Sequence, residues 1–197
     1  MRLRSTSSIM PEALRRRTHL TAILIALAAA ALSPIAAQQP AKRTPDIHPD
    51  IHFVPTSRGV ADAMLKLANV TSNDVVYDLG SGDGRIVIAA AKNYGARGVG
   101  VELDPELIKT ATKNARKAGV ADKVTFIQGD LFKTDFSDAT VVTLYLSDSI
   151  NRRIASILQR QLKPGARIVS HRFDMGDWKP EADVRLEGTH VLLWTIR

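Results

Sequence analysis

The chain of 197 residues is long enough for one ordinary domain with some additional length, and 45% of it is apolar, enough for a hydrophobic core. It contains no cysteine, which excludes disulfides, cysteine-ligated zinc and thiol catalysis. The formal charge of +7 is concentrated at the N-terminus: residues 1–37 hold five Arg and one Glu, whereas residues 38–197 hold 22 basic and 19 acidic residues. So small a surplus gives no argument for a nucleic-acid partner.

Residues 1–37 have the parts of a secretory signal or a membrane anchor. Three consecutive arginines at 15–17 precede an apolar run from Ala22 to Leu32, and small residues follow up to Ala37. Such a charged region, short apolar run and small-residue cleavage site are typical of a signal peptide. The run is shorter than the about 20 residues of a comfortable membrane span. The sequence therefore predicts a periplasmic protein if the leader is cleaved near Ala37, and otherwise one anchored in the inner membrane.

Residues 38–55 contain four prolines and are predicted to be a linker, and residues 56–197 are predicted to form the domain. Strands and helices alternate in that domain, which indicates an α/β fold with a parallel sheet and crossover helices. The predicted helices are Ser57–Asn69, Arg85–Asn93, one from Pro105 that stops at Gly119, and Ser149–Gln161. The predicted strands are Val75–Leu79, Gly98–Glu102, Val124–Gln128, Thr140–Leu146, Arg167–Ser170, Val184–Glu187 and Val191–Ile196, the last two as a hairpin.

A glycine-rich turn joins the first of these strands to the helix that follows it. Its pattern, from Asp78 to Gly84, is D-x-G-x-G-x-G. The dinucleotide fingerprint G-x-G-x-x-G would need its third glycine where Arg85 stands. The carboxylates of Asp78 and Asp83 would repel a pyrophosphate and attract a ligand that carries an ammonium and a sulfonium. The turn therefore predicts S-adenosylmethionine as the cofactor, in preference to NAD.

Two further acids end the next two strands. Glu102 lies 24 residues after Asp78, close to the spacing at which a doubly wound fold places an acid on a ribose. Asp130 ends the third strand in a Gly-Asp pair, where a carboxylate can accept a hydrogen bond from the adenine amine, although a simple turn acid is the alternative. The predicted cofactor-binding residues are Asp78, Gly80, Ser81, Gly82, Asp83, Gly84, Glu102, Leu103, Asp130 and Leu131.

The candidates for catalysis follow the fourth and fifth strands. Tyr145 could hydrogen-bond an incoming amine or shelter a cation, but it could equally be packed inward. Asp148 is a candidate base or a helix cap, and His171 is a candidate base or a structural histidine. The residues after the fifth strand, His171 to Phe173 and Trp178, are expected to wall the acceptor pocket. The other histidines show no ligand spacing, so no metal is predicted.

Several segments occur together in an order that resembles a known family. They are Phe53-Val54-Pro55-Thr56, the motif Val76–Ile88, Gly98–Leu103, and Arg172-Phe173 with Trp178. The D-x-G-x-G-x-G pattern looks like motif I of the class I S-adenosylmethionine-dependent methyltransferases. Over about residues 53–180 the chain resembles the small lysine methyltransferases related to the mitochondrial enzyme that modifies the c subunit of ATP synthase, and their prokaryotic relatives.

The resemblance implies a Rossmann-like, seven-stranded class I methyltransferase sheet with helices on both faces. It implies that Asp78, Gly80, Gly82 and Glu102 hold the cofactor, that residues 54–56 cap the pocket, and that a protein lysine accepts the methyl group. A chain with so little sequence for a lid suits a protein acceptor. A small-molecule methyltransferase and a non-catalytic module that only binds S-adenosylmethionine are the alternatives. The apolar leader adds a possible association with a membrane.

Overall fold

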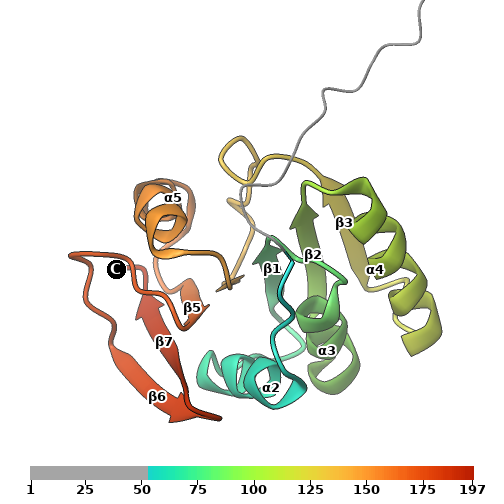
Figure 1. Ribbon diagram of the computed structural model, residues 1–197, viewed down its shortest axis with the longest axis horizontal. Coiled ribbons are helices and arrows are strands. Elements are labelled where there is room, and N and C mark those ends of the chain that lie inside the picture. The colour runs from blue at the N-terminus through green and yellow to red at the C-terminus, as the bar shows by residue number, and fades with distance from the viewer. Residues whose placement is uncertain (1–52) are drawn as a thin grey trace, which may run out of the picture. The chain divides into compact units, whose positions relative to one another are not determined.

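The computed structural model describes residues 53–197, which form an α/β domain (Figure 1). The predicted signal or anchor at residues 1–37, and residues 38–52 of the predicted linker, lie outside the described residues. Among the helices of the described residues, none combines the length and the apolar character that crossing a bilayer requires. Residues 53–197 also contain no group of three or more His, Asp or Glu side chains that could hold a metal ion.

Seven strands form one sheet in the order β3-β2-β1-β4-β5-β7-β6. The strands are β1 (Val75–Leu79), β2 (Arg97–Glu102), β3 (Val124–Gln128), β4 (Val141–Leu144), β5 (Arg167–His171), β6 (Ala182–Leu186) and β7 (Thr189–Thr195). The five strands from β3 to β5 run parallel, and β7 is antiparallel to both of its neighbours. The predicted seven-stranded sheet and terminal hairpin are confirmed. Strand β4 ends at Leu144, two residues before its predicted end, so Tyr145 lies just beyond the strand.

Four helices accompany the sheet: α2 (Arg58–Leu67), α3 (Arg85–Tyr94), α4 (Pro105–Ala118) and α5 (Asp148–Gln161). Asp104 caps α4 by accepting a hydrogen bond from the backbone N–H of Glu106 at 2.8 Å, and Gly119 ends that helix with φ 74°. Both features were predicted. The cap of α5 is Ser147, whose hydroxyl accepts from the N–H of Ile150 at 3.3 Å. Asp148 therefore does not cap α5.

The helices cover both faces of the sheet, as predicted (Figure 1). Val76 of β1 packs in a cluster with residues of α2 and α3, whereas Tyr77 and Leu79 pack in a cluster with residues of α5. Helix α4 joins the first side through a third cluster with α3 and β3. All five residues of β1 are buried, because this central parallel strand is covered on both faces. That burial extends to Asp78, the penultimate residue of β1.

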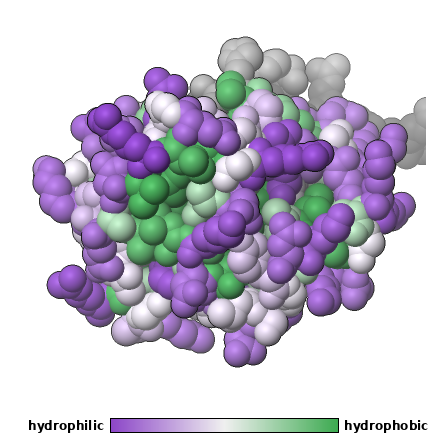
Figure 2. Space-filling model, turned by 90° about the horizontal axis from the view of Figure 1, so that it is seen from below, coloured by the Kyte–Doolittle hydropathy of each residue, from purple (hydrophilic) through white to green (hydrophobic). Residues whose placement is uncertain are grey.

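Figure 2 shows a face of the molecule on which polar side chains surround an apolar patch. Among all described residues, the large apolar side chains that are exposed are Phe53, Val54, Ile127 and Val184. Phe53 and Val54 adjoin the cavity that holds most of the predicted site residues. They are therefore available to contact a partner that approaches this cavity.

Candidate active site

A cavity of about 620 Å³ opens where β1 to β4 end at the carboxyl edge of the sheet. This edge is where open α/β sheets bind ligands. Eight of the ten predicted cofactor-binding residues line the cavity: Asp78, Gly80, Ser81, Asp83, Glu102, Leu103, Asp130 and Leu131. Gly82 and Gly84 do not line it. The sequence therefore identified most of the cavity wall that β1, β2 and β3 contribute.

The glycine turn is shaped by its contacts with the rest of the domain. The backbone N–H groups of Gly80 and Ser81 both donate to the carbonyl of Val101, at 2.8 and 3.0 Å, so the turn folds back on β2. Gly82 has φ 53°, and the ring of Phe53 leaves no room for a Cβ there. Gly84 has φ 79° and starts α3. Gly82 and Gly84 thus determine the path of the backbone and contribute no surface to the cavity.

Glu102 ends β2 and ties the glycine turn to that strand. Its Oε2 accepts from the N–H of Gly82 at 2.8 Å. Its Oε1 accepts from the N–H groups of Leu103 and Asp104 at 2.7 and 3.0 Å. The residue is 8% exposed and lies on the cavity wall. Three backbone donors therefore hold the carboxylate at the place where the sequence predicted a ribose acceptor.

Asp78 is the most buried carboxylate of the cavity wall. The Thr143 hydroxyl donates to its Oδ1 at 2.7 Å, and the residue is 3% exposed. Burial raises the pKa of Asp78 to about 7 from an ordinary 3.8, even though the hydrogen bond from Thr143 opposes the change. The negative charges of Glu102 and Asp83 add to the rise. A cationic ligand would supply the counter-charge that this carboxylate lacks.

Asp83 is already paired. Arg85 donates from Nε to its Oδ1 at 2.9 Å and from Nη2 to its Oδ2 at 2.7 Å. Burial alone would raise the pKa of Asp83, but the hydrogen bonds and charge of Arg85 outweigh it and hold the pKa below its ordinary value. Arg85 also donates from Nη1 to the carbonyl of Thr56 at 2.8 Å. The charge of Asp83 is thus paired with that of Arg85, whereas Asp78 has no cationic partner within residues 53–197.

Asp130 lies in a turn after β3. Its Oδ1 accepts from the N–H of Phe132 at 2.9 Å, and Lys133 Nζ lies 3.4 Å from its Oδ2 in an exposed ion pair. The guanidinium of Arg153, from α5, lies 4.1 Å from the centre of the Phe132 ring. Phe132, Lys133 and Arg153 line the cavity, and none was predicted from the sequence. The sequence around Asp130 contains no pattern that predicts these contacts, because Arg153 of α5 reaches Phe132 only in the folded domain.

An aromatic cluster stands at the β4 side of the cavity. Tyr145 lines the cavity, and its ring stacks on that of His171 with centroids 3.9 Å apart. The Phe173 ring lies 6.0 Å from Tyr145 on nearly parallel planes. Burial, aided by the charge of Arg172, lowers the pKa of His171, so its imidazole is neutral at neutral pH. Of these rings only that of Tyr145 lines the cavity, and His171 and Phe173 stack against it without reaching the cavity wall, which corrects the expectation that residues 171–173 wall the acceptor pocket. Asp148 is exposed and does not line the cavity either.

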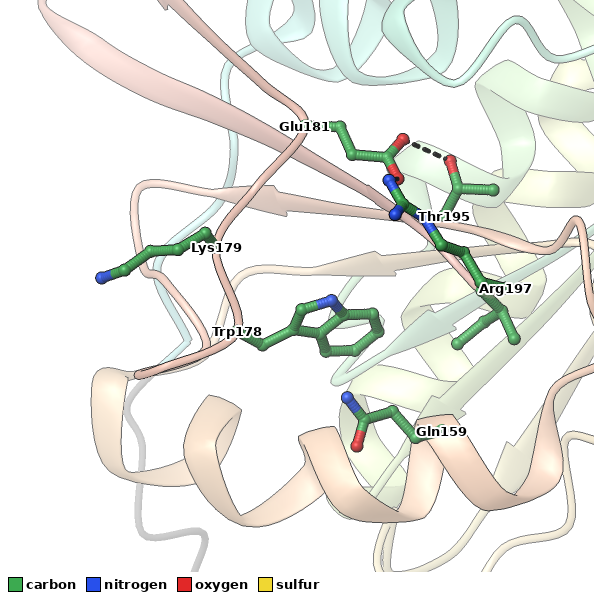
Figure 3. A pocket seen from close by; sticks show the side chains of 7 residues that line it. Gln159, Trp178, Lys179, Glu181, Thr195 and Arg197 are labelled. Atoms are coloured by element: carbon green, nitrogen blue, oxygen red, sulfur yellow. Dashed lines mark hydrogen bonds and ion pairs between the residues drawn. The ribbon is translucent and has the colours of Figure 1, made fainter.

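Trp178 lies elsewhere and corrects the expectation that it walls the acceptor pocket. It lines a second cavity of about 430 Å³ between α5 and the end of β7, together with Gln159, Lys179, Glu181, Thr195, Ile196 and Arg197 (Figure 3). The carbonyl of Trp178 accepts from Trp194 Nε1 at 2.7 Å, and the two rings lie 6.2 Å apart. This contact with a buried core residue draws Trp178 away from the aromatic cluster.

Comparison with known proteins shows similarity to methyltransferases over most of the described domain. The sequence profile described as the ANTKMT methyltransferase domain matches residues 78–182. A protein-lysine N-methyltransferase of Saccharolobus islandicus is 42% identical over 140 residues, which cover 71% of this chain and 87% of that protein. The adenine nucleotide translocase lysine N-methyltransferase of Mus musculus is 36% identical over 77% of this chain, which spans only 65% of the mouse enzyme.

One solved structure with high sequence identity to this chain is described as an RNA methyltransferase and not as a lysine methyltransferase. It is an RNA methyltransferase from Salinibacter ruber in complex with S-adenosyl-L-homocysteine. It is 62% identical in sequence and superposes with a TM-score of 0.72, covering 73% of this chain and 94% of that one. The relatives thus agree on methyl transfer, whereas their names divide between lysine and RNA as the acceptor.

Proposed function

Because the chain belongs to the ANTKMT methyltransferase domain family, we propose that it transfers the methyl group of S-adenosylmethionine to a lysine side chain of a protein. The observation that carries this proposal is the cavity in which the carboxylates of Asp78, Glu102 and Asp130 meet the ring of Tyr145. Asp78 and Glu102 come from the ends of β1 and β2, Asp130 lies in the turn after β3, and the ring follows β4. One cavity thus contains both a cofactor side and an acceptor side.

The residues of the cofactor side fit S-adenosylmethionine. Asp78 offers a buried carboxylate without a cationic partner to the ammonium group, and Glu102 offers a fixed carboxylate to the ribose hydroxyls. Asp130 offers its Oδ2 to the adenine amine, because its Oδ1 accepts from the N–H of Phe132 and the ion pair of Oδ2 with Lys133 is exposed to solvent. When bound, the cofactor supplies a methyl carbon attached to a sulfonium. The same set of acids is unsuited to the pyrophosphate of NAD.

The acceptor side is suited to a lysine amine. A lysine has an ordinary pKa of about 10.4 and must lose its proton before it can act as a nucleophile. The uncharged ring of Tyr145, which lines the cavity with Leu146 and Ile150, disfavours the charged ammonium and so lowers the pKa of an amine that packs against it. The remaining requirement is alignment of the amine with the methyl carbon and the sulfur, which a fixed Tyr145 ring helps to provide.

The proposal is tested by incubating the purified protein with S-adenosylmethionine carrying a radioactive methyl group and a cell lysate. We expect label in protein, removable by protease and resistant to ribonuclease, and methyl-lysine after acid hydrolysis. Label confined to small molecules would indicate the small-molecule alternative. Tight cofactor binding without any transfer would indicate a non-catalytic binding module.

RNA is the second candidate acceptor, because the description of the Salinibacter ruber protein favours it. The same assay separates the two acceptors, since label in RNA would be lost on ribonuclease treatment. The surface of residues 53–197 offers RNA little general attraction, because 20 Lys and Arg are nearly balanced there by 17 Asp and Glu. The lysine acceptor is therefore the leading candidate.

Cofactor binding is expected to depend on pH through Asp78. A cationic ligand prefers the ionised carboxylate, whose pKa in the free protein is about 7. The dissociation constant of S-adenosylmethionine should therefore rise on the order of tenfold as the pH falls from 7.5 to 5.5. Calorimetric titration at several pH values measures this. In the Asp78→Asn variant the same titration should be flat over this range, and an equally steep dependence there would assign the proton to another group.

We further propose that residues 1–37 stay attached to the domain and hold it at the inner face of a membrane. The need for a cofactor that is made in the cytoplasm supports this, whereas the charged and apolar composition of the segment fits a cleaved signal and an anchor alike. Fractionation of cells, followed by mass spectrometry of the N-terminal peptide, tests it. A mature N-terminus near Gln38 in the periplasmic fraction would contradict the proposal.

A further inference from the structure

Thr56 contacts both sides of the active-site cavity. Its carbonyl accepts from Arg85 Nη1 at 2.8 Å, and its hydroxyl shares a hydrogen bond with His171 Nδ1 at 3.3 Å. The residue is 4% exposed and lies in the segment before α2 that lines the cavity. Thr56 and His171 are 115 positions apart in the sequence. A short polar side chain thus joins the N-terminal segment to the end of β5.

The two contacts of Thr56 are part of a chain of contacts that runs from the glycine turn to Tyr145. On the cofactor side, Arg85 is held by two hydrogen bonds to Asp83 of the glycine turn. On the acceptor side, the ring of His171 stacks on Tyr145, with an angle of 29° between the planes. The hydrogen bond of Thr56 is the one side-chain hydrogen bond that His171 makes among the residues that the structure describes. It therefore fixes the rotation of the imidazole, and with it the face that Tyr145 packs against.

The backbone that carries His171 is held independently of Thr56. Asn151, fully buried in α5, donates from Nδ2 to the hydroxyl of Ser170 and to the carbonyl of Phe173, both at 3.0 Å. The Ser170 hydroxyl donates to the same carbonyl at 2.6 Å. These bonds hold a tight turn in which Arg172 takes the unusual φ of 73°. Loss of the Thr56 hydroxyl therefore frees the His171 ring without releasing the turn.

We propose that Thr56 is a positioning residue that acts through His171 to hold the ring of Tyr145, which lines the cavity. This inference rests on the proposed function, in which the acceptor enters beside that ring. Because the carbonyl of Thr56 accepts a hydrogen bond from Arg85, the same residue contacts both the glycine turn and the support of the Tyr145 ring. The alignment of the acceptor amine with the methyl group therefore depends on the hydroxyl of Thr56.

Thr56→Val tests the proposal, since it keeps the shape of the side chain and removes the hydroxyl. We expect kcat for the protein acceptor to fall about tenfold, while the dissociation constant of S-adenosylhomocysteine stays within about twofold. Thr56→Ser restores the hydroxyl and should recover most of the rate. In a His171→Phe background, Thr56→Val should cause no further loss, because the two residues act as one unit.

Nuclear magnetic resonance supplies a readout that needs no acceptor. The ring nitrogens of His171 should report one neutral tautomer in the wild type and in Thr56→Ser, and a mixture in Thr56→Val. If no protein is methylated at all, the proposed function fails, and this spectrum alone still decides the role of Thr56. Unchanged ring nitrogens in Thr56→Val overturn the inference, as do additive losses in the double variant or an equal loss of cofactor affinity.

Discussion

Asp78→Asn is expected to make the fold more stable at pH 8 while it weakens the binding of S-adenosylmethionine at the same pH. The carboxylate of Asp78 is buried and, among residues 53–197, receives a single side-chain hydrogen bond, from Thr143. An asparagine keeps an oxygen that can accept this bond and carries no charge that burial would penalise. The variant therefore removes a cost to folding together with the counter-charge for the ammonium group of the ligand.

The pH dependence of this effect follows from the raised pKa. In the unfolded chain Asp78 titrates near 3.8, whereas in the folded protein its pKa is about 7. Between these values the native state binds more protons, so the contribution of Asp78 to stability falls as the pH rises through this window. Above pH 7 the full cost is present and amounts to about 4 kcal/mol. Below pH 4 the cost disappears, because the carboxyl is protonated in both states.

Urea denaturation of the wild type and of Asp78→Asn at pH 5 and pH 8 measures the difference. We expect the stabilisation at pH 8 to exceed that at pH 5 by about 1 to 3 kcal/mol, and cofactor affinity at pH 8 to fall about tenfold or more. Asp122→Asn, at an exposed turn, is a matched control that should change neither quantity. A destabilised Asp78→Asn at pH 8 would mean that the carboxylate is better solvated than its burial indicates.

The sequence predicted those parts of the fold that local chemistry determines. Strand β3 was predicted with its observed bounds, and α4 was predicted with its cap at Asp104 and its end at Gly119. These boundaries depend on residues within one turn of each other. Asp148 was predicted as a cap because its residue type suits that position, but the neighbouring Ser147 has the extended backbone that a cap requires.

The acceptor side was harder to predict because it is built from distant segments. The contact of Thr56 with His171 and the position of Arg153 over Phe132 depend on how β5 and α5 pack, and no local pattern encodes either. Trp178 follows β5 closely in sequence and was expected beside His171, yet its contact with Trp194 places it in another cavity. The pairing of Asp83 with Arg85, by contrast, was within reach of the sequence, since they lie two positions apart.

Glu102→Gln is expected to have the opposite effect on stability from Asp78→Asn and an even larger effect on cofactor binding. Glu102 accepts three backbone hydrogen bonds, from Gly82, Leu103 and Asp104. A glutamine has one accepting oxygen, so its amide nitrogen must face at least one of these N–H donors and leave it unpaired in a buried place. The variant should therefore unfold at a lower urea concentration, and its glycine turn should lose its link to β2.

Cofactor affinity should fall about 100-fold in Glu102→Gln, which corresponds to about 3 kcal/mol, because a charged acceptor for the ribose and the shape of the turn are lost together. Calorimetry with S-adenosylhomocysteine measures this, with Glu106→Gln as the control, since the Glu106 side chain is exposed and its partner in the described part of the chain is Lys109. An affinity within threefold of the wild type would show that Glu102 does not hold the ribose. Asp78 and Glu102 are both buried carboxylates of one cavity, and the number of donors that each receives determines whether removing its charge stabilises or destabilises the fold.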